Sequence, residues 1–374
     1  MGEQKRAAFL FSDTGGGHRS AAEAVVEAVE RSYGTRIEVA LVDGLLEYAP
    51  TPFNRLPGWY PSMVRTPRMW GTSFRISNGR QRGRVLTTLT WPYVRRAARR
   101  LVADVSADIF VVFHPLLIVP TLKALGPDRP PVFAVVTDLV SGHSLWYQPR
   151  LDLCLVPTEA AAEKARRNRV APERVRVVGL PVAERFCHSL GDEAGLRAEL
   201  GWPVDRPMIL IVGGGEGMGP LFEAARAVAR SGLEAGLAIV AGRNAALRRR
   251  LEQVAWEIPT FVYGFEQRMP EMMQAATLLV TKAGPSTIAE AVNAALPLVL
   301  YSFLPGQEEG NVEYVVGQGL GRWAPGAAQT AAAVRSYLED PGELDRAIEA
   351  CRRAARPGAA RAVADVVAQR LGVD

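Results

Sequence analysis

Short apolar runs alternate with helical patterns along the whole chain, and this alternation constrains the fold more than any other feature. In the first half, the apolar runs lie at 7–11, 37–43, 109–113, 131–138, 153–157 and 175–181. In the second half, they lie at 207–215, 237–242, 260–265, 277–284 and 297–302. Short β-rich runs separated by helices are typical of α/β domains with mostly parallel sheets. The sequence therefore predicts two Rossmann-like α/β domains.

A change in composition near residue 183 separates the two halves. Residues 183–206 are polar with a helical pattern, and prolines follow at 203 and 207. We therefore expect an N-terminal domain at 1–182, a linker at 183–206 and a C-terminal domain at 207–340. The last segment, 341–374, has helical patterns and could cross back to the N-terminal domain. A chain of 374 residues is long enough for two domains with separate cores.

The first half opens with a strand, three glycines and a histidine, FLFSDTGGGHRSAAEAV (9–25). Gly15, Gly16 and Gly17 let a ligand approach the backbone, and His18 follows at the helix start. Because a helix N-terminus carries partial positive charge, it disfavours a protonated imidazole. We expect His18 to be neutral near pH 7 and to accept a proton from a substrate hydroxyl; a space-filling histidine is the alternative. The turn has neither a P-loop lysine nor the GxGxxG spacing of NAD-binding proteins.

A second helix start with hydroxyl groups lies in TKAGPSTIAEA (281–291). Ser286 and Thr287 begin this helix, where hydroxyls and backbone N–H groups suit a diphosphate. Glu290 lies one turn further and could accept hydrogen bonds from ribose hydroxyls; an N-capping Ser286 and a surface Glu290 are the alternative. In the polar loop LPGQEEGN (304–311), Gln307 and Glu308 offer groups that bind sugar hydroxyls.

The segment between Tyr48 and Ala103 contains eleven arginines and no acidic residue, although the net charge of the whole chain is only +5. Trp59, Tyr60 and Trp70 lie among these arginines, and we expect the segment to be irregular until a helical stretch near 93–103. Arginine interleaved with aromatic residues suits anionic lipid headgroups or nucleic acid; a solvated face without function is the third alternative. We expect the segment 48–103 to bind an anionic membrane surface and not nucleic acid.

Cysteine usage and hydropathy indicate the cellular setting. The isolated cysteines form neither a disulfide framework nor a metal-binding spacing: Cys154, Cys187 and Cys351. The N-terminus has no signal-peptide pattern, and the longest apolar stretch, 109–122, is interrupted by prolines and too short to span a bilayer. We expect a cytoplasmic protein that lies on the inner face of the cell membrane without crossing it.

Six motifs occur in the same order between residue 9 and about residue 320: SDTGGGHRSAAEA, FNRLPGWY, VTDLVSGHSLWY, GGGEGMGP, TKAGPSTIAEA and PGQEEGNVEYVV. Together they resemble the monogalactosyldiacylglycerol synthase family, which also covers bacterial processive diacylglycerol glucosyltransferases. More distantly, the chain is similar to the peptidoglycan lipid-II-forming N-acetylglucosaminyltransferase. The resemblance implies a GT-B fold of glycosyltransferase family 28, in which two Rossmann-like domains face a central cleft.

The resemblance also implies an activity and a set of site residues. A hexose, galactose or glucose, would pass from a UDP-sugar to the hydroxyl of diacylglycerol, with inversion and without a metal, a covalent intermediate or a cofactor. His18 would be the general base. The donor would bind the uracil at Phe265, the ribose at Glu290, the sugar at Gln307 and Glu308, and the diphosphate and nucleotide at Gly213, Gly214, Gly215, Glu216, Gly217, Lys282, Ala283, Gly284, Ser286 and Thr287. The acceptor and the membrane would lie at Gly15, Gly16, Gly17, Trp59, Tyr60 and Trp70.

Two positions depart from the family pattern. GLPVAER places Ala183 where relatives commonly have an arginine, and Arg185 follows two positions later. Ser286 stands where relatives often have glycine. A UDP-sugar epimerase and a catalytically silent nucleotide-sugar-binding protein are the alternative functions. The basic aromatic segment disfavours the epimerase, which needs no lipid-facing surface, and His18 disfavours the silent protein.

Overall fold

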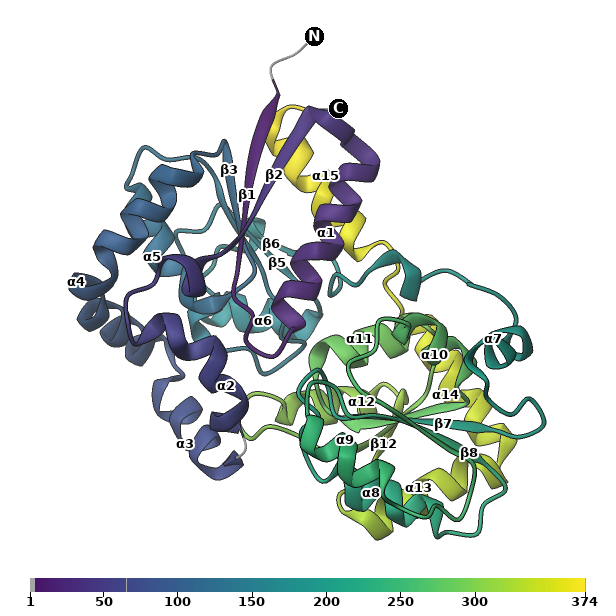
Figure 1. Cartoon of the computed structure of the whole chain (residues 1–374). Coiled ribbons are helices and arrows are strands. Elements are labelled where there is room, and N and C mark those ends of the chain that lie inside the picture. The colour runs from purple at the N-terminus through teal and green to yellow at the C-terminus, as the bar shows by residue number, and fades with distance from the viewer. Residues whose placement is uncertain (1–3, 65, 374) are drawn as a thin grey trace. The chain divides into compact units, whose positions relative to one another are not determined.

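The computed structural model describes residues 4–64 and 66–373 and divides the chain into two compact units (Figure 1). The first unit comprises the chain up to Ala183, the short segment Pro305–Gln307 and the segment from Gly358 onward. The second unit comprises Glu184–Leu304 and Glu308–Pro357. Arg65, one of the arginines of the basic segment, lies outside the described residues. Each unit has one parallel six-stranded sheet with helices, which confirms the predicted α/β fold class.

The sheet of the first unit has the strand order β2-β1-β3-β4-β5-β6. Its strands are β1 (Lys5–Phe11), β2 (Ile37–Asp43), β3 (Ile109–Val112), β4 (Val132–Val135), β5 (Leu153–Val156) and β6 (Val175–Val177). All neighbouring pairs are parallel, and β3 and β4 are buried at every position. Burial on both faces explains why these strands are continuous apolar runs and not alternating ones.

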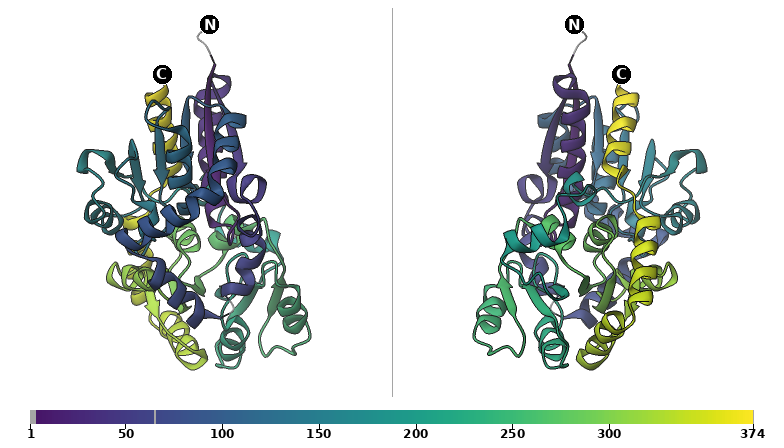
Figure 2. Two further views of the ribbon diagram at one scale, coloured as in Figure 1. Left: turned by 90° about the vertical axis from the view of Figure 1, so that its left-hand side faces the viewer. Right: turned by 90° about the vertical axis from the view of Figure 1, so that its right-hand side faces the viewer.

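The helices of the first unit are α1 (Gly17–Tyr33), α2 (Leu56–Val64), α3 (Pro67–Ser77), α4 (Arg80–Val105), α5 (Pro115–Leu125), α6 (Glu159–Arg167) and α15 (Ala359–Leu371). The C-terminal helix α15 packs along α1 (Figure 2). Buried Val363 and Val367 join the core cluster of α1, and Tyr33 donates a hydrogen bond of 2.7 Å to Asp365. The last helix of the chain is therefore part of the first unit's core.

The basic segment is helical, whereas we expected it to be irregular up to about residue 93. It forms α2, α3 and the 26-residue helix α4, with Pro92 inside α4. The less exposed positions of α4 follow helical spacing and include Thr87, Trp91 and Val94. Arginines occupy many positions between them, so the apolar stripe is too narrow to be recognised from the sequence. The expectation of an irregular segment was wrong for this reason.

The sheet of the second unit has the strand order β12-β11-β10-β7-β8-β9. Its strands are β7 (Met208–Val212), β8 (Gly236–Val240), β9 (Thr260–Tyr263), β10 (Leu278–Lys282), β11 (Leu298–Ser302) and β12 (Gly321–Trp323). All pairs are parallel. The apolar runs predicted β7 to β11. They did not predict β12, an edge strand of only three residues, GRW.

The helices of the second unit are α7 (Glu193–Leu200), α8 (Leu221–Ala229), α9 (Ala245–Glu252), α10 (Met269–Ala275), α11 (Pro285–Asn293), α12 (Glu309–Gly317), α13 (Ala327–Glu339) and α14 (Pro341–Ala354). The segment expected to be a linker, 183–206, contains α7, which packs on α10. Leu196 and Leu200 are buried there, and the buried Arg197 side chain donates a hydrogen bond to the carbonyl of Ala275. From Glu184 onward this segment therefore belongs to the second unit. No described helix is both long enough and apolar enough to cross a membrane.

Both sheets have a point where the strand order reverses direction. In the first unit it lies between β1 and β3, and in the second unit between β7 and β10. Open parallel sheets bind ligands beyond the carboxyl ends of their strands at such a point. In the first unit the segment that follows β1 leads to His18, and in the second unit Lys282 ends β10. The topology therefore places one candidate site in each unit.

Candidate active site

Two glycines with positive φ allow the chain to turn from β1 into α1. Gly15 has a φ of +83° and Gly16 a φ of +86°, a conformation that residues with a Cβ rarely adopt. A Cβ at Gly15 would also lie 2.8 Å from the ring of Tyr60, so Tyr60 packs directly on the turn. Gly17 is the first residue of α1, and His18 is the second. The three glycines thus place His18 in the first turn of the helix.

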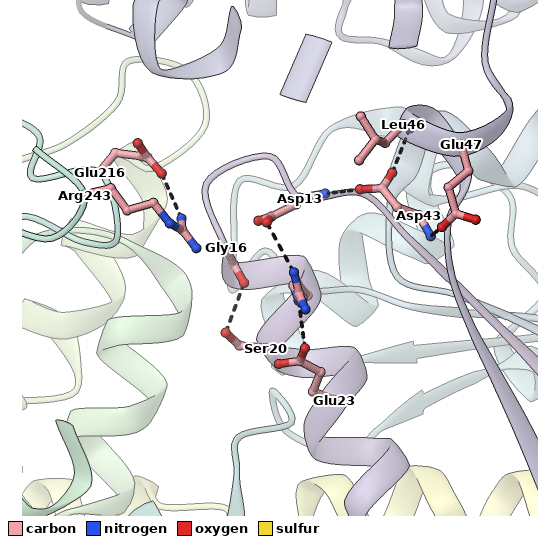
Figure 3. A network of polar contacts seen from close by, with 10 residues as sticks. Asp13, Gly16, Ser20, Glu23, Asp43, Leu46, Glu47, Glu216 and Arg243 are labelled. Atoms are coloured by element: carbon pink, nitrogen blue, oxygen red, sulfur yellow. Dashed lines mark hydrogen bonds and ion pairs between the residues drawn. The ribbon is translucent and has the colours of Figure 1, made fainter. Parts of the chain in front are cut away.

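The carboxylate of Asp43 holds this turn against the sheet (Figure 3). Asp43 ends β2 and is buried. Its Oδ2 accepts a hydrogen bond of 3.0 Å from the amide of Asp13, and its Oδ1 accepts from the amides of Leu45 and Leu46 at 3.1 and 2.9 Å. One side chain therefore fixes both the loop after β1 and the turn after β2. Sequence reasoning did not identify this residue.

The imidazole of His18 is oriented by a threonine. Its Nδ1 lies 2.7 Å from Oγ1 of Thr137, which is 2% exposed and follows β4. Burial lowers the pKa of His18, and the carboxylates of Asp138 and Asp13 only partly oppose this effect. A neutral imidazole agrees with the expectation, but burial is the main cause. An isolated helix dipole is therefore not needed to explain it.

A second histidine lies next to His18. The rings of His114 and His18 meet edge to face with 4.7 Å between centroids. His114 caps α5 through Nδ1, which accepts a hydrogen bond of 3.3 Å from the amide of Leu116. A neutral His114 therefore carries its proton on Nε2 and donates it to Oγ1 of Thr14, 3.1 Å away. Burial and the neighbouring His18 hold the pKa of His114 well below its usual range.

A cavity of about 240 Å³ opens at His18, and we call it the His18 cavity. Asp138 lines it and is 5% exposed, and its carboxylate accepts from Nε1 of Trp146 at 2.7 Å and from Nε2 of Gln307 at 3.3 Å. His143 also lines it, and burial lowers the pKa of His143 to about 4. Most of the remaining lining is apolar, from α2, α3 and α5.

Two buried polar atoms that border the His18 cavity have no hydrogen-bond partner within the described part of the chain. They are Nε1 of Trp70, a donor, and Oε1 of Gln307, an acceptor. Tyr60 lines the same cavity and meets Trp70 edge to face at 5.5 Å. Trp59 is 45% exposed and lies outside the lining of this cavity. Buried polar groups without partners are rare, so this donor and this acceptor are available to a ligand.

In the second unit, the glycine turn after β7 packs too tightly for side chains. A Cβ at Gly217 would collide with the carbonyl oxygen of Ala241, and a Cβ at Gly213 would lie 2.8 Å from the backbone of the same turn. Gly214 has a φ of +70°, and a Cβ there would lie 3.3 Å from Cε of Lys282. Gly215 accepts a hydrogen bond from the amide of Arg243. The turn therefore approaches Lys282 through bare backbone.

Lys282 and Glu308 form a buried ion pair at the carboxyl end of β10. Nζ of Lys282 lies 2.6 Å from Oε1 of Glu308, and the two side chains are 10% and 3% exposed. Oε2 of Glu308 accepts a hydrogen bond of 2.9 Å from the amide of Leu304. Ala283 is buried, and Gly284 caps α11 directly after this pair, with no room for a Cβ because Nζ of Lys282 would be 2.9 Å away. The lysine is thus held in place by a carboxylate.

The first turn of α11 contains Ser286 and Thr287, whose amides have no partner inside the helix because its first N–H groups lack one. One turn further, burial raises the pKa of Glu290 to about 8, and the positive charge of Arg185 opposes this effect. Arg185, in the stretch GLPVAER, therefore acts on Glu290 electrostatically. These groups gather at one helix start, as the sequence predicted.

Arg243 connects two of the predicted donor-binding residues. Its guanidinium donates a hydrogen bond of 2.9 Å to Glu216 (Figure 3) and stacks over the ring of Phe265 with 4.6 Å to the centroid. Phe265 is 57% exposed. Sequence reasoning missed Arg243, although it directly follows the strand and glycine of LAIVAG, as glycine-turn residues do.

The two residues that the sequence predicted as sugar ligands belong to different compact units. Gln307 belongs to the first unit and lines the His18 cavity, and Glu308 belongs to the second unit with Lys282. Thr137 and His114 were also missed. His114 follows β3, which pairs with β1, and Thr137 follows β4, which pairs with β3. Only the strand order therefore identifies these two residues as neighbours of His18.

Two family models match the chain in order. The family described as "Monogalactosyldiacylglycerol (MGDG) synthase" matches residues 18–182, and "Glycosyltransferase family 28 C-terminal domain" matches residues 208–340. The "Probable monogalactosyldiacylglycerol synthase 2, chloroplastic" of Oryza sativa subsp. japonica is 36% identical, over 97% of this chain and 79% of the rice protein. "Monogalactosyldiacylglycerol synthase 1, chloroplastic" of Arabidopsis thaliana is 34% identical, over 95% of this chain and 69% of the plant protein.

Solved structures with low sequence identity share the fold. MurG of Acinetobacter baumannii aligns with a TM-score of 0.62 and 17% identity, over 97% of this chain and 99% of MurG. The UDP-GlcNAc 2-epimerase from Neisseria meningitidis, solved bound to UDP-GlcNAc, aligns with a TM-score of 0.61 and 11% identity, over 97% of this chain and all of the epimerase. The shared fold is the GT-B architecture, and because glycosyltransferases and epimerases both have it, only the sequence similarity separates them. On that similarity, the chain belongs to the monogalactosyldiacylglycerol synthase family of glycosyltransferases.

Proposed function

We propose that this protein transfers a hexose from a UDP-hexose to the free hydroxyl of diacylglycerol, with inversion at the anomeric carbon and without a metal ion. The observation that carries the proposal is a neutral imidazole at the mouth of a largely apolar cavity. The unpartnered Nε1 of Trp70 suits an ester carbonyl of the acceptor. The names of the plant relatives favour galactose as the sugar, with glucose as the alternative.

His18 is the proposed general base. In the proposed tautomer, Nδ1–H donates to Oγ1 of Thr137, which leaves the lone pair of Nε2 for the proton of the acceptor hydroxyl. As this proton moves to Nε2, the hydroxyl oxygen bonds to the anomeric carbon, and UDP departs with the electron pair of the broken C–O bond. Attack on the face opposite UDP inverts the anomeric carbon. A positioned base of this kind contributes about 10²–10⁴ in rate.

The second unit is proposed to bind the donor and to stabilise UDP as it leaves. Lys282, the N–H groups at the start of α11 and those of the glycine turn 213–217 supply positive potential for the diphosphate, which makes a metal ion unnecessary. Phe265 with Arg243 suits the uracil, and Glu290 suits the ribose. Gln307 and Glu308 remain the proposed sugar ligands. Each oxygen of Glu308 already accepts one hydrogen bond and keeps a further lone pair.

The basic segment 48–103 is proposed to hold the protein on the inner face of an anionic membrane. Of fifteen large hydrophobic side chains that are exposed among the described residues, nine lie between Leu46 and Tyr93. Leu89, Met69 and Ile76 are 74%, 70% and 66% exposed, on helices that also carry arginines. Apolar side chains and arginines on one segment suit the boundary between headgroups and acyl chains.

UDP release and the glycolipid product test the catalytic proposal. The purified protein is mixed with equal UDP-galactose and UDP-glucose, with and without diacylglycerol vesicles, and the products are identified by mass spectrometry. Release of UDP that depends on the acceptor, with a hexosyl diacylglycerol as product, supports the transferase. Isomerised sugar without acceptor would establish the epimerase instead, and tight UDP-sugar binding without turnover would establish the silent protein. His18→Ala is expected to abolish transfer and to keep the affinity for UDP, and wild-type turnover in this variant would remove His18 from the base role.

Vesicle flotation tests the membrane proposal. Arg84, Arg95, Arg96 and Arg99 are exposed on α4, and their replacement by Gln removes four positive charges without emptying the core. Each basic residue near an anionic surface contributes on the order of 1 kcal/mol, so binding to anionic vesicles should fall steeply and should also fall with salt. Replacing Arg166, Arg167, Arg249 and Arg250, exposed on α6 and α9, is the matched control. An equal loss of vesicle binding in both variants would show that binding depends on the net charge of the protein and not on the basic segment.

A further inference from the structure

A second cavity of the first unit adjoins the His18 cavity. It encloses about 120 Å³ between α4, α5 and the π-helical turn Gly44–Tyr48, and we call it the α4–α5 cavity. The residues that line both cavities are all apolar: Leu45, Leu86, Pro115, Leu116 and Leu145. The partition between the proposed base and the α4–α5 cavity therefore consists of hydrocarbon.

The lining of the α4–α5 cavity suits a hydrocarbon chain. Trp91, Val94 and Leu101 contribute from α4, and none of the described residues that line it is charged at neutral pH. The hydroxyls of Thr87 and Thr90 donate to carbonyls of their own helix, at 3.1 and 2.9 Å, and so offer no donor to a ligand. A sugar, phosphate or nucleotide would lose its hydrogen bonds to water here and gain none from the protein. An alkyl chain makes no hydrogen bonds to water, so its transfer into this cavity is favourable.

The size and the opening of this cavity fit one chain. Its volume equals roughly ten water-sized volumes of 10–15 Å³ each, which is room for several methylenes in a row and too little for two chains. Leu86 and Leu116, in the shared wall, are 38% and 37% exposed, so the wall reaches the surface of the unit. Leu86 lies on α4 beside exposed Val85 and Leu89, within the segment proposed to face the membrane.

We propose that the α4–α5 cavity binds one acyl chain of the diacylglycerol acceptor while the glycerol hydroxyl lies at Nε2 of His18. The inference rests on the proposed function, because that function supplies the acceptor. The shared apolar wall lets one molecule occupy both cavities, with its ester groups at Trp70 and its chain beyond Leu86 and Leu116. Each methylene buried in the cavity raises affinity about fourfold, and methylenes beyond its end add nothing. The length of the cavity thereby sets the acyl-chain length beyond which affinity for the acceptor no longer rises.

Photo-crosslinking locates the chain without relying on turnover. Wild-type protein in detergent micelles is irradiated with diacylglycerol that carries a diazirine in the middle of one acyl chain, and labelled peptides are mapped by mass spectrometry. Label is expected on 86–101 and 116–121. Phosphatidylcholine with the same diazirine chain is the second arm, because an acyl chain of the bilayer has the same chemistry. Phosphatidylcholine labelling that excess diacylglycerol does not displace would assign the cavity to bilayer lipid and overturn the proposal.

Chain-length kinetics provide an independent readout. Ala98 lines the α4–α5 cavity, and Ala98→Phe fills it, whereas Ala103→Phe adds the same ring at an exposed position of α4 and is the matched control. If the ring displaces two or three methylenes, the ratio of kcat/KM for long-chain over short-chain acceptors should fall by about 15- to 60-fold in Ala98→Phe alone. UDP affinity and the melting temperature establish that both variants are folded.

The outcomes separate this proposal from the proposed function. If glycolipid forms but the label avoids the cavity, or Ala98→Phe keeps the control's chain-length ratio, the acyl site is overturned and the transferase stands. If no diacylglycerol is glycosylated by the wild type, the transferase is overturned, and labelling of the cavity alone then decides the acyl site. Label in the cavity together with a collapsed ratio supports both.

Discussion

Glu290→Gln should make the second unit more stable, and the gain should grow with pH. Burial raises the pKa of Glu290 to about 8, against 4.5 for an unperturbed glutamate. The folded state therefore binds this proton more tightly than the unfolded state does. Ionisation of Glu290 costs nothing below pH 4.5, costs progressively more between pH 4.5 and 8, and reaches its limit above pH 8. Glutamine has the same shape and never ionises, so the variant avoids this cost.

The pKa difference sets the magnitude. At about 1.4 kcal/mol per pKa unit, the limiting cost is about 5 kcal/mol. Linkage gives a cost of about 1 kcal/mol at pH 5 and about 4 kcal/mol at pH 8. For a unit of this size, 1 kcal/mol shifts the melting temperature by about 2–4 °C, so the variant should melt about 2–4 °C higher at pH 5 and about 8–16 °C higher at pH 8.

Calorimetry at pH 5 and pH 8 checks this expectation, with the two units fitted as separate transitions. Glu313→Gln is the control, because Glu313 is an exposed glutamate of the same unit on α12. A shift for Glu290→Gln that is equal at both pH values, or a wild type that melts higher than this variant at pH 8, would refute the reasoning. Above pH 8, where Glu290 is ionised, the same substitution should weaken UDP binding about tenfold, because an amide oxygen accepts ribose hydrogen bonds less strongly than a carboxylate oxygen. Stability gained and affinity lost together would identify Glu290 as a ligand-binding group.

Two further substitutions test how side chains are held in place. Thr137→Val should lower kcat about tenfold without changing the KM for the UDP-sugar, because His18 loses the partner of its Nδ1, and Thr137→Ser should restore kcat; unchanged kcat in Thr137→Val would show that the hydrogen bond is not needed. Lys282→Met should cost about 3–5 kcal/mol because it leaves the buried carboxylate of Glu308 unpaired, and adding Glu308→Gln should recover stability measured by urea unfolding but not turnover. Recovery of turnover in the double variant would remove Lys282 from the leaving-group role.

The sheets were predictable from local sequence, and one long helix was not. β7 (Met208–Val212) lies within its apolar run, 207–215, because a strand that is buried at every position leaves an uninterrupted signal. α4 was recognised only near its end, because arginines between its inward residues break the apolar stripe. β12 has three residues at a sheet edge and carries no periodic signal. Local patterns therefore identify elements whose whole surface is buried and miss those that are buried on one narrow side.

The site was predictable where its chemistry is local and hidden where it depends on strand order. His18 and Lys282 each adjoin a glycine turn, so the neighbouring residues indicate their place. Thr137 contacts His18 across 119 positions in the sequence. His114 does so across 96 positions, through strand β3 beside β1. No local pattern specifies that β3 pairs with β1 or that β4 pairs with β3, so these partners of His18 follow only from the completed sheet.

The two units manage opposite electrostatic demands, and this division explains their contrasting residues. Around His18 the neighbours are mostly neutral and buried, and His114 shifts toward the neutral form with it, which keeps Nε2 able to accept a proton. Around Lys282, the carboxylate of Glu308 compensates the buried positive charge and leaves two of the lysine's three N–H donors for the proposed diphosphate. A general base is favoured where burial destabilises its charged form, whereas a departing diphosphate is favoured by positive potential. Each of these demands is met at the strand-order reversal of its own sheet.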